Sequence, residues 1–186
     1  MNIVLVHGSF GKPFENWFPW LEMEMSQRGI SCVIPTFPTP EHQTYSEWEK
    51  LLDYYRDMGV INNETILIGH SCGAICIARY IATHRLHIKG VICVSGYNNF
   101  YSGNELMDAL NKTFYCDDQD LNIMEYTEHI TAFYSDNDPN IPLIYLTSFA
   151  EAIGANKRLV KNAGHFNAKA GYLSFREILN DILPFV

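Results

Sequence analysis

The feature that most constrains this chain is a Gly-x-Ser-x-Gly sequence centred on Ser71, which follows the apolar run 65–68 and precedes a helix-forming stretch. A strand that passes through a sharp turn into a helix is the context in which such a serine serves as a nucleophile. The turn is strained, and glycines on either side of the serine let neighbouring backbone come close. Gly69 and Gly73 occupy these two positions. Ser71 is therefore the candidate nucleophile.

Length and composition limit what else the chain can be. With 186 residues, of which 47% are hydrophobic and 18% charged, it can bury one good core. We therefore expect a single domain over residues 1–186. The net charge of −8 offers no basic surplus for phosphates or anionic lipids, so nucleic acids and membranes are not expected partners. Five scattered cysteines, with neither a leader-like segment nor a membrane-spanning run, favour a cytoplasmic protein with free thiols.

Short apolar runs alternate with helix-forming segments along the whole chain. Strands are predicted at 3–6, 31–34, 65–68, 88–94, 130–134 and 157–160, and helices at 16–28, about 44–58, 72–84, 143–153 and 174–183. This alternation predicts an α/β fold with a doubly wound, mainly parallel six-stranded sheet, helices on both faces and the strand order 2-1-3-4-5-6. The pattern of residues 97–128 is irregular and indicates only short helices, near 104–110 and 120–128. We therefore expect a minimal lid over the site.

A serine hydroxyl becomes a good nucleophile only when a base removes its proton. Of the seven histidines, His165 follows the sixth predicted strand and so lies at the same edge of the sheet as Ser71. His70 belongs to the turn itself and is expected to point beneath it, and His7 belongs to the first loop. The others fit helix ends or surface loops: His42, His84, His87 and His129. His165 is therefore the candidate base.

A histidine base needs a carboxylate that fixes its tautomer and stabilises the imidazolium. The fifth predicted strand is followed by a turn-like sequence with two aspartates, Asp136 and Asp138. Asp138 is preferred because Asp-x-x-Ile-Pro resembles the acid-loop pattern of α/β-hydrolases, and Asp136 is the alternative. The order Ser71, Asp138, His165 is the order of that fold.

Acyl transfer also needs backbone N–H groups that stabilise the tetrahedral oxyanion. The N–H of Cys72 is one candidate, since it lies at the start of a helix whose dipole favours negative charge. The second should come from the loop after the first strand, where Ser9 is preferred and Phe10 is the alternative. The Cys72 thiol is a weaker candidate nucleophile, because its position next to Ser71 directs its side chain elsewhere.

The chain resembles the small serine hydrolases typified by retinoblastoma-binding protein 9 and its bacterial relatives. The resemblance extends over nearly the whole length and is carried by His7-Gly8, the segment 16–21, the proline-rich loop 35–40, and the segments 69–74, 135–139 and 164–166. It implies a compact α/β-hydrolase with a Ser-Asp-His triad and esterase-like activity, and the triad positions match Ser71, Asp138 and His165.

The expected function is therefore hydrolysis of small or short-chain acyl esters through an acyl-Ser71 intermediate. No cofactor is implied, and His84-x-x-His87 and the acidic run 117–120 lack the further ligands of a metal site. Two alternatives stay open: a protein-binding module with little turnover, and an amidase or peptidase. The expected partner is a small acyl substrate, and nothing in the sequence supports a protein partner.

Overall fold

The computed structural model describes residues 1–99, 103–127 and 129–186. Within these ranges the sheet has six strands: β1 (Asn2–Val6), β2 (Ser31–Val33), β3 (Thr65–His70), β4 (Gly90–Val94), β5 (Ile130–Ser135) and β6 (Asn156–Val160). Their order is β2-β1-β3-β4-β5-β6, and every neighbouring pair is parallel. The predicted fold class and strand order are confirmed.

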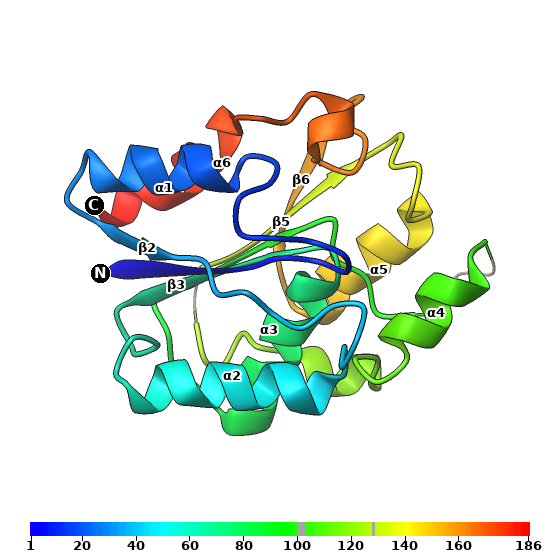
Figure 1. Ribbon diagram of the computed structural model, residues 1–186, viewed down its shortest axis with the longest axis horizontal. Helices are drawn as coiled ribbons and strands as arrows, with labels where there is room; N and C mark the ends of the chain where they lie inside the picture. Colours follow the sequence, from blue (N-terminus) through cyan, green and yellow to red (C-terminus); the bar gives the residue numbers. More distant parts are fainter. Residues whose placement is uncertain (100–102, 128) are drawn as a thin grey trace.

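Helices cover both faces of the sheet, as Figure 1 shows. α1 (Phe18–Ser26) and α6 (Arg176–Ile182) lie on one face, over a core that includes Leu5 and Ile68. α2 (Tyr45–Asp57), α3 (Cys72–His84) and α5 (Leu143–Ala152) lie on the other, over a core that includes Val6 and Leu67. Because every residue of β3 is buried and its neighbours are parallel, the turn after β3 has a rigid base.

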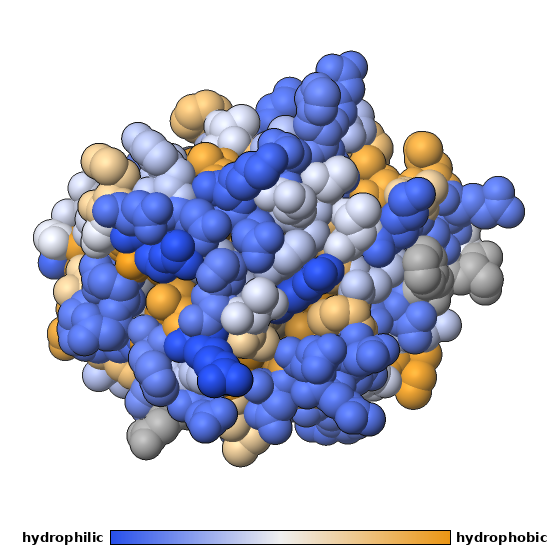
Figure 2. Space-filling view, turned by 90° about the horizontal axis from the view of Figure 1, so that it is seen from below, coloured by the Kyte–Doolittle hydropathy of each residue, from blue (hydrophilic) through white to orange (hydrophobic). Residues whose placement is uncertain are grey.

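The outer surface of the α2 face is mostly hydrophilic, as seen in Figure 2.

The starts of α2 and α1 have local causes. α2 begins where predicted, because the Thr44 side chain accepts a hydrogen bond of 3.2 Å from the Glu47 N–H and caps the first turn. α1 begins two residues later than predicted, because Asn16 has a φ of 56° that a helix does not accommodate.

The segment before β5 differs from the prediction in part. α4 (Glu105–Asn111) matches the predicted short helix, and it lies at the edge of the molecule in Figure 1. The helix predicted over 120–128 is wrong: the chain forms the short 3₁₀ helix η1 (Asp118–Leu121) and then turns. The Asn122 side chain accepts a hydrogen bond from the Met124 N–H, a local bond that competes with helix formation. Residue 128 and residues 100–102 of this segment lie outside the described residues.

In the ranges that the structure describes, none of the helices has the length and apolar character that crossing a bilayer requires.

Candidate active site

Ser71 lies on the turn between β3 and α3 with an unusual backbone conformation. Its φ is 55° and its ψ is −122°, a combination that costs a residue with a side chain on the order of 1–3 kcal/mol. The turn is held in place because the Ser71 N–H donates to the Val94 carbonyl oxygen at 2.8 Å, at the end of β4. The residue is 7% exposed. The strained turn thus places the hydroxyl at the carboxyl edge of the sheet.

The two glycines that flank the turn are required by close packing. A Cβ added to Gly73 would lie 2.2 Å from the Val6 carbonyl oxygen, and one added to Gly69 would lie 2.6 Å from the Ala74 Cα. Both distances are far shorter than any real contact of a Cβ. The Gly-x-Ser-x-Gly spacing therefore lets α3 pack directly on the backbone of β1.

The loop after β1 lies directly against Ser71. A Cβ added to Gly8 would lie 2.8 Å from the Ser71 Cβ and 3.3 Å from its Oγ. The strand order predicts this neighbourhood, since β1 and β3 are adjacent and parallel. The backbone N–H groups of this loop can therefore reach a group bound to Ser71.

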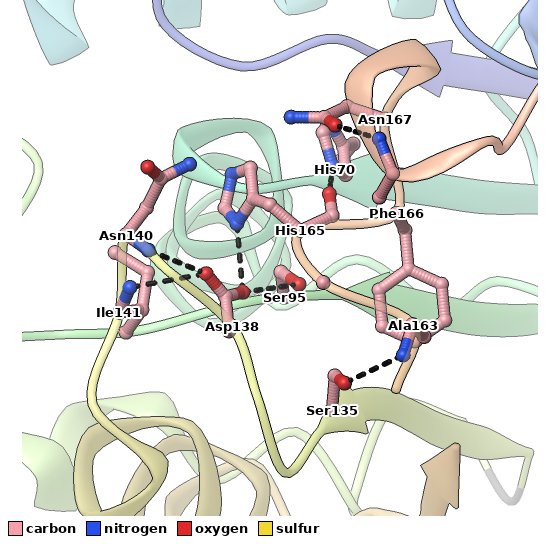
Figure 3. Close-up of polar contacts among 12 residues, drawn as sticks. His70, Ser95, Ser135, Asp138, Asn140, Ile141, Ala163, His165, Phe166 and Asn167 are labelled. Carbon is pink, nitrogen blue, oxygen red and sulfur yellow. Dashed lines mark hydrogen bonds and ion pairs between the residues drawn. The ribbon is translucent and has the colours of Figure 1, made fainter. Parts of the chain in front are cut away.

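Asp138 and His165 meet in a short hydrogen bond, shown in Figure 3. The His165 Nδ1 lies 2.7 Å from the Asp138 Oδ2, and the carboxylate side chain is 1% exposed. The Oδ1 atom accepts from the N–H groups of Asn140 and Ile141 at 2.9 and 3.1 Å. Burial alone would raise the pKa of Asp138, but the His165 hydrogen bond and charge and these two amides outweigh it, so the pKa is lowered.

The Ser95 hydroxyl is a further partner of this carboxylate, which is absent from the sequence prediction. Ser95 follows β4, is fully buried, and donates from its Oγ to the Asp138 Oδ2 at 3.0 Å (Figure 3). It has a φ of 49°, so its backbone too is in a conformation that side chains rarely adopt. The sequence does contain a signal for it, since Ser95 is the first residue after the fourth strand and so lies at the carboxyl edge of the sheet, as Ser71 does.

Asp136, the alternative acid, has a different partner from the histidine ring. Its Oδ1 accepts a hydrogen bond of 2.8 Å from the Asn162 N–H. Asn137 accepts from the Gly164 N–H at 2.8 Å, and Ser135 accepts from the Ala163 N–H at 3.0 Å. The polar side chains before Asp138 therefore fix the backbone of the loop that carries the histidine.

His70 bonds the backbone of the same loop, the one that carries His165. Its Nε2 lies 2.9 Å from the carbonyl oxygen of His165, and its ring packs edge-on against Trp17 and Phe18. Burial, with a smaller contribution from the nearby His165, lowers the pKa of His70 to about 3. The ring is therefore neutral and donates its Nε2–H to that carbonyl. His7 is held in a similar way between the Gly8 carbonyl oxygen and the Phe37 N–H, and burial lowers its pKa.

Ser71, Asp138 and His165 all line one cavity of about 1270 Å³. Among the hydrogen bonds of the described residues, none joins the Ser71 Oγ to the His165 ring. Hydrogen bonds between a nucleophile and its base often tighten only when substrate binds. The structure therefore brings the three predicted residues to one cavity, with the serine and the imidazole facing it as separate groups.

Of the candidate oxyanion donors, Ser9 and Phe10 line the same cavity, and Cys72 directly follows Ser71, which also lines it. Cys72 begins α3, where backbone N–H groups have no acceptor within the helix. Its thiol is fully buried, and burial raises its pKa, so it is not a reactive nucleophile. In the first loop the Phe10 N–H donates to the Thr39 Oγ1 at 2.7 Å and is engaged, which favours the N–H of Ser9.

Comparison with known proteins adds independent findings. The sequence model of the serine hydrolase family matches residues 3–182. YdeN of Bacillus subtilis (strain 168), a candidate hydrolase, is 26% identical over 184 residues, which are 98% of this chain and 94% of the relative. Serine hydrolase RBBP9 of Rattus norvegicus is 28% identical over 184 residues, which are 97% of this chain and 95% of the relative.

Solved structures have the same fold. The crystal structure of the ydeN gene product from B. subtilis aligns with a TM-score of 0.87 at 24% identity, over 99% of this chain and 97% of that one. Est1E from Butyrivibrio proteoclasticus, solved with ferulic acid bound, aligns with a TM-score of 0.71 at 13% identity, over 98% of this chain and 90% of that one.

Proposed function

Because this chain belongs to the serine hydrolase family, we propose that it hydrolyses esters with small or short-chain acyl groups through an acyl intermediate on Ser71. The observation that carries the proposal is the 2.7 Å hydrogen bond between His165 and the buried carboxylate of Asp138, at the cavity that Ser71 also lines. With Nδ1 bound to Asp138, the Nε2 atom of the ring is the one left to exchange a proton with Ser71 and with the leaving group.

In this mechanism the Ser71 Oγ attacks the acyl carbon while the His165 Nε2 takes the hydroxyl proton. Asp138 holds the ring in the required tautomer and stabilises the imidazolium. The N–H groups of Ser9 and Cys72 bind the oxyanion of the tetrahedral intermediate. His165 then gives its proton to the leaving alcohol, and a water molecule activated by the same histidine releases the acyl group.

The open shape of the cavity supports a preference for substrates with small acyl groups. Several apolar side chains that line it remain largely exposed, among them Phe14 at 85%, Leu173 at 66% and Ile144 at 65%. In the described part of 97–127, α4 and the short η1 are the regular elements, and only α4 reaches the cavity. A cleft of this kind surrounds a long chain on one side only, so each added methylene buries less apolar area than it would in a closed tunnel.

A fluorophosphonate probe tests the mechanism directly. Wild type should be labelled and Ser71→Ala should not, while Ser148→Ala is the matched control because the Ser148 hydroxyl bonds the Ile144 carbonyl of its own helix. Ester turnover should fall by about 10³-fold or more in Ser71→Ala and His165→Ala. Equal labelling of wild type and Ser71→Ala would refute the proposal.

A panel of substrates separates this proposal from its alternatives. Nitrophenyl esters of increasing chain length should be cleaved fastest at the short end, and matched anilides more slowly than the esters. A preference for long chains would refute the acyl-size proposal, and faster cleavage of anilides would favour an amidase. A labelled protein that turned over no member of the panel would favour a protein-binding module.

We also propose a cytoplasmic location. It is supported by the five cysteines, all of which are free in the structure. Free buried thiols such as those of Cys76 and Cys93 persist in a reducing compartment.

A further inference from the structure

Two amide side chains are buried beneath the loop that follows β1. Gln43 is 5% exposed and Asn111 is fully buried. The Gln43 Nε2 donates to the Ser9 Oγ and to the Asn111 Oδ1, both at 2.7 Å. The Ser9 Oγ in turn donates to the Asn111 Oδ1 at 2.7 Å. Three segments that are far apart in the sequence therefore meet below the loop.

A third side chain, Thr39, connects this group to the backbone of the loop. Its Oγ1 accepts a hydrogen bond of 2.7 Å from the Phe10 N–H and donates to the Gln43 Oε1. The Asn111 Nδ2 donates to the Tyr97 hydroxyl at 2.8 Å, which ties the end of α4 to the same network. Side chains therefore join the loop after β1 to the segment just before α2 and to the end of α4.

The bonds of this network form a consistent chain of donors and acceptors. The Phe10 N–H donates to the Thr39 hydroxyl, which donates in turn to the Gln43 Oε1. Gln43 presents its NH₂ group to Ser9 and Asn111, and the Ser9 hydroxyl donates to Asn111. A buried network whose partners are satisfied holds its members rigidly.

The loop needs such support from outside. Phe10 has a φ of 59°, an unfavourable conformation for a residue with a side chain. An oxyanion donor is effective only when it lies within a few tenths of an ångström of its place in the transition state. Thr39, Gln43 and Asn111 are absent from the described residues that line the cavity. They can therefore act on the reaction through the groups that they hold, which are the loop and, through the 3.9 Å contact of the Gln43 Nε2 with the Cys72 Sγ, the start of α3.

We propose that Thr39, Gln43 and Asn111 are positioning residues that hold residues 8–11 so that the N–H of Ser9, and not that of Phe10, faces the oxyanion. The proposal rests on the proposed function, since it assigns a role in the same acyl transfer. Thr39 engages the Phe10 N–H, and the two amides fix the Ser9 side chain, so that together they orient the peptide between Gly8 and Ser9. Negative charge on the carbonyl oxygen develops in the transition state, so misplacing this peptide should affect kcat more than KM.

The test compares Thr39→Val, which replaces the hydroxyl by a methyl group, with Thr39→Ser, which keeps it. Removing one oxyanion donor costs about 10²- to 10³-fold in kcat, so we expect misplacement in Thr39→Val to lower kcat by roughly 10- to 100-fold with KM changed less than about twofold. Thr39→Ser should recover most of the lost kcat. Gln43→Met is a second disruption of the network, and urea unfolding shows that each variant is folded under assay conditions.

A trifluoromethyl ketone inhibitor supplies the readout that a merely structural role would not change. Its adduct with Ser71 carries an oxyanion, so its inhibition constant should rise by the same factor as kcat/KM falls. Thr147→Val is the matched control, because the Thr147 hydroxyl bonds the carbonyls of its own helix; both parameters should equal those of wild type.

Two results would overturn the inference: a folded Thr39→Val and a folded Gln43→Met that both keep wild-type kcat, or a fall in kcat without a change in inhibitor affinity. Failure of the proposed function is a separate outcome, because it would appear as absence of turnover and labelling in the wild type.

Discussion

The buried imidazole of His70 should make the protein lose stability in mild acid. Burial lowers the pKa of His70 to about 3, whereas an imidazole in the unfolded chain titrates near pH 6.5. Below pH 6.5 the unfolded chain therefore binds a proton that the folded protein does not. Stability is fully present above about pH 6.5 and is lost as the pH falls from there toward 3.

The size of this stability loss follows from the titration of the imidazole in the unfolded chain alone. At about pH 5 an exposed imidazole is protonated about 30-fold more often than not, so His70 contributes a loss of about 2 kcal/mol relative to neutral pH. The lowered pKa of His7 acts in the same direction. Asp138, whose pKa is also lowered, contributes stability that is lost only below about pH 4, and so adds little at pH 5.

Urea unfolding at neutral pH and at about pH 5 measures this loss. His70→Gln keeps an amide donor for the His165 carbonyl and does not titrate, so between the two pH values it should lose about 2 kcal/mol less than wild type. Trp17→Phe, which perturbs the aromatic packing around the same ring, should be less stable at both pH values but lose as much as wild type between them. Equal losses in wild type and His70→Gln would refute the reasoning.

Two further predictions concern the turn and the acid. Gly73→Ala forces a Cβ to within 2.2 Å of the Val6 carbonyl oxygen and should lower the free energy of unfolding by about 3 kcal/mol or more, whereas Gly59→Ala, at a φ of 72° in open space, should cost about 1 kcal/mol. Urea unfolding of both variants checks this, and equal costs would contradict the packing argument. Ser95→Ala removes a hydroxyl donor from the Asp138 carboxylate and should lower kcat roughly tenfold. Ester hydrolysis measured beside Ser148→Ala checks it, and an unchanged kcat would show that His165 and the two backbone amides orient the carboxylate without Ser95.

The sequence predicted the sheet and the nucleophile turn because both depend on local patterns. A continuous apolar run, a glycine spacing and a following helix lie within a few residues of Ser71, and the parallel topology then places every strand end at one edge. The helix predicted over 120–128 was wrong for an equally local reason. The hydrogen bond that the Asn122 side chain accepts from the Met124 N–H outweighs a weak helical preference of this segment.

The choice between Asp136 and Asp138 could not be made on physical grounds from the sequence. Both follow the same strand, and both are residues that turns prefer. The first accepts from the Asn162 N–H, while the backbone between them turns so that only the second reaches the His165 ring. Similarly, Ser9 and Phe10 are distinguished by Thr39, which is 29 residues from Phe10 in the chain. No pattern within the first loop contains that information.

A parallel sheet explains why so many polar side chains gather where only a few act. Beyond the last ladder bond, each strand leaves backbone N–H and C=O groups near a largely buried edge, and these groups need partners. Asn137 supplies one to Gly164, and His70 supplies one to His165. A polar residue after a strand is thus by itself weak evidence for catalysis.

A better indicator of a catalytic role is a polar atom of a cavity-lining residue that has no hydrogen-bond partner among the described residues. Asn137 and Thr39 both have their oxygen atoms engaged in hydrogen bonds. In the hydrogen bonds of the described chain, the Ser71 Oγ and the His165 Nε2 are not engaged, although both residues line the cavity. A hydroxyl and a ring nitrogen that line one cavity without a hydrogen-bond partner are the groups that a bound substrate could engage. On this criterion, Ser71 and His165 are the groups that we propose to react, and the polar side chains whose hydrogen bonds are all made are the ones that we propose to position them.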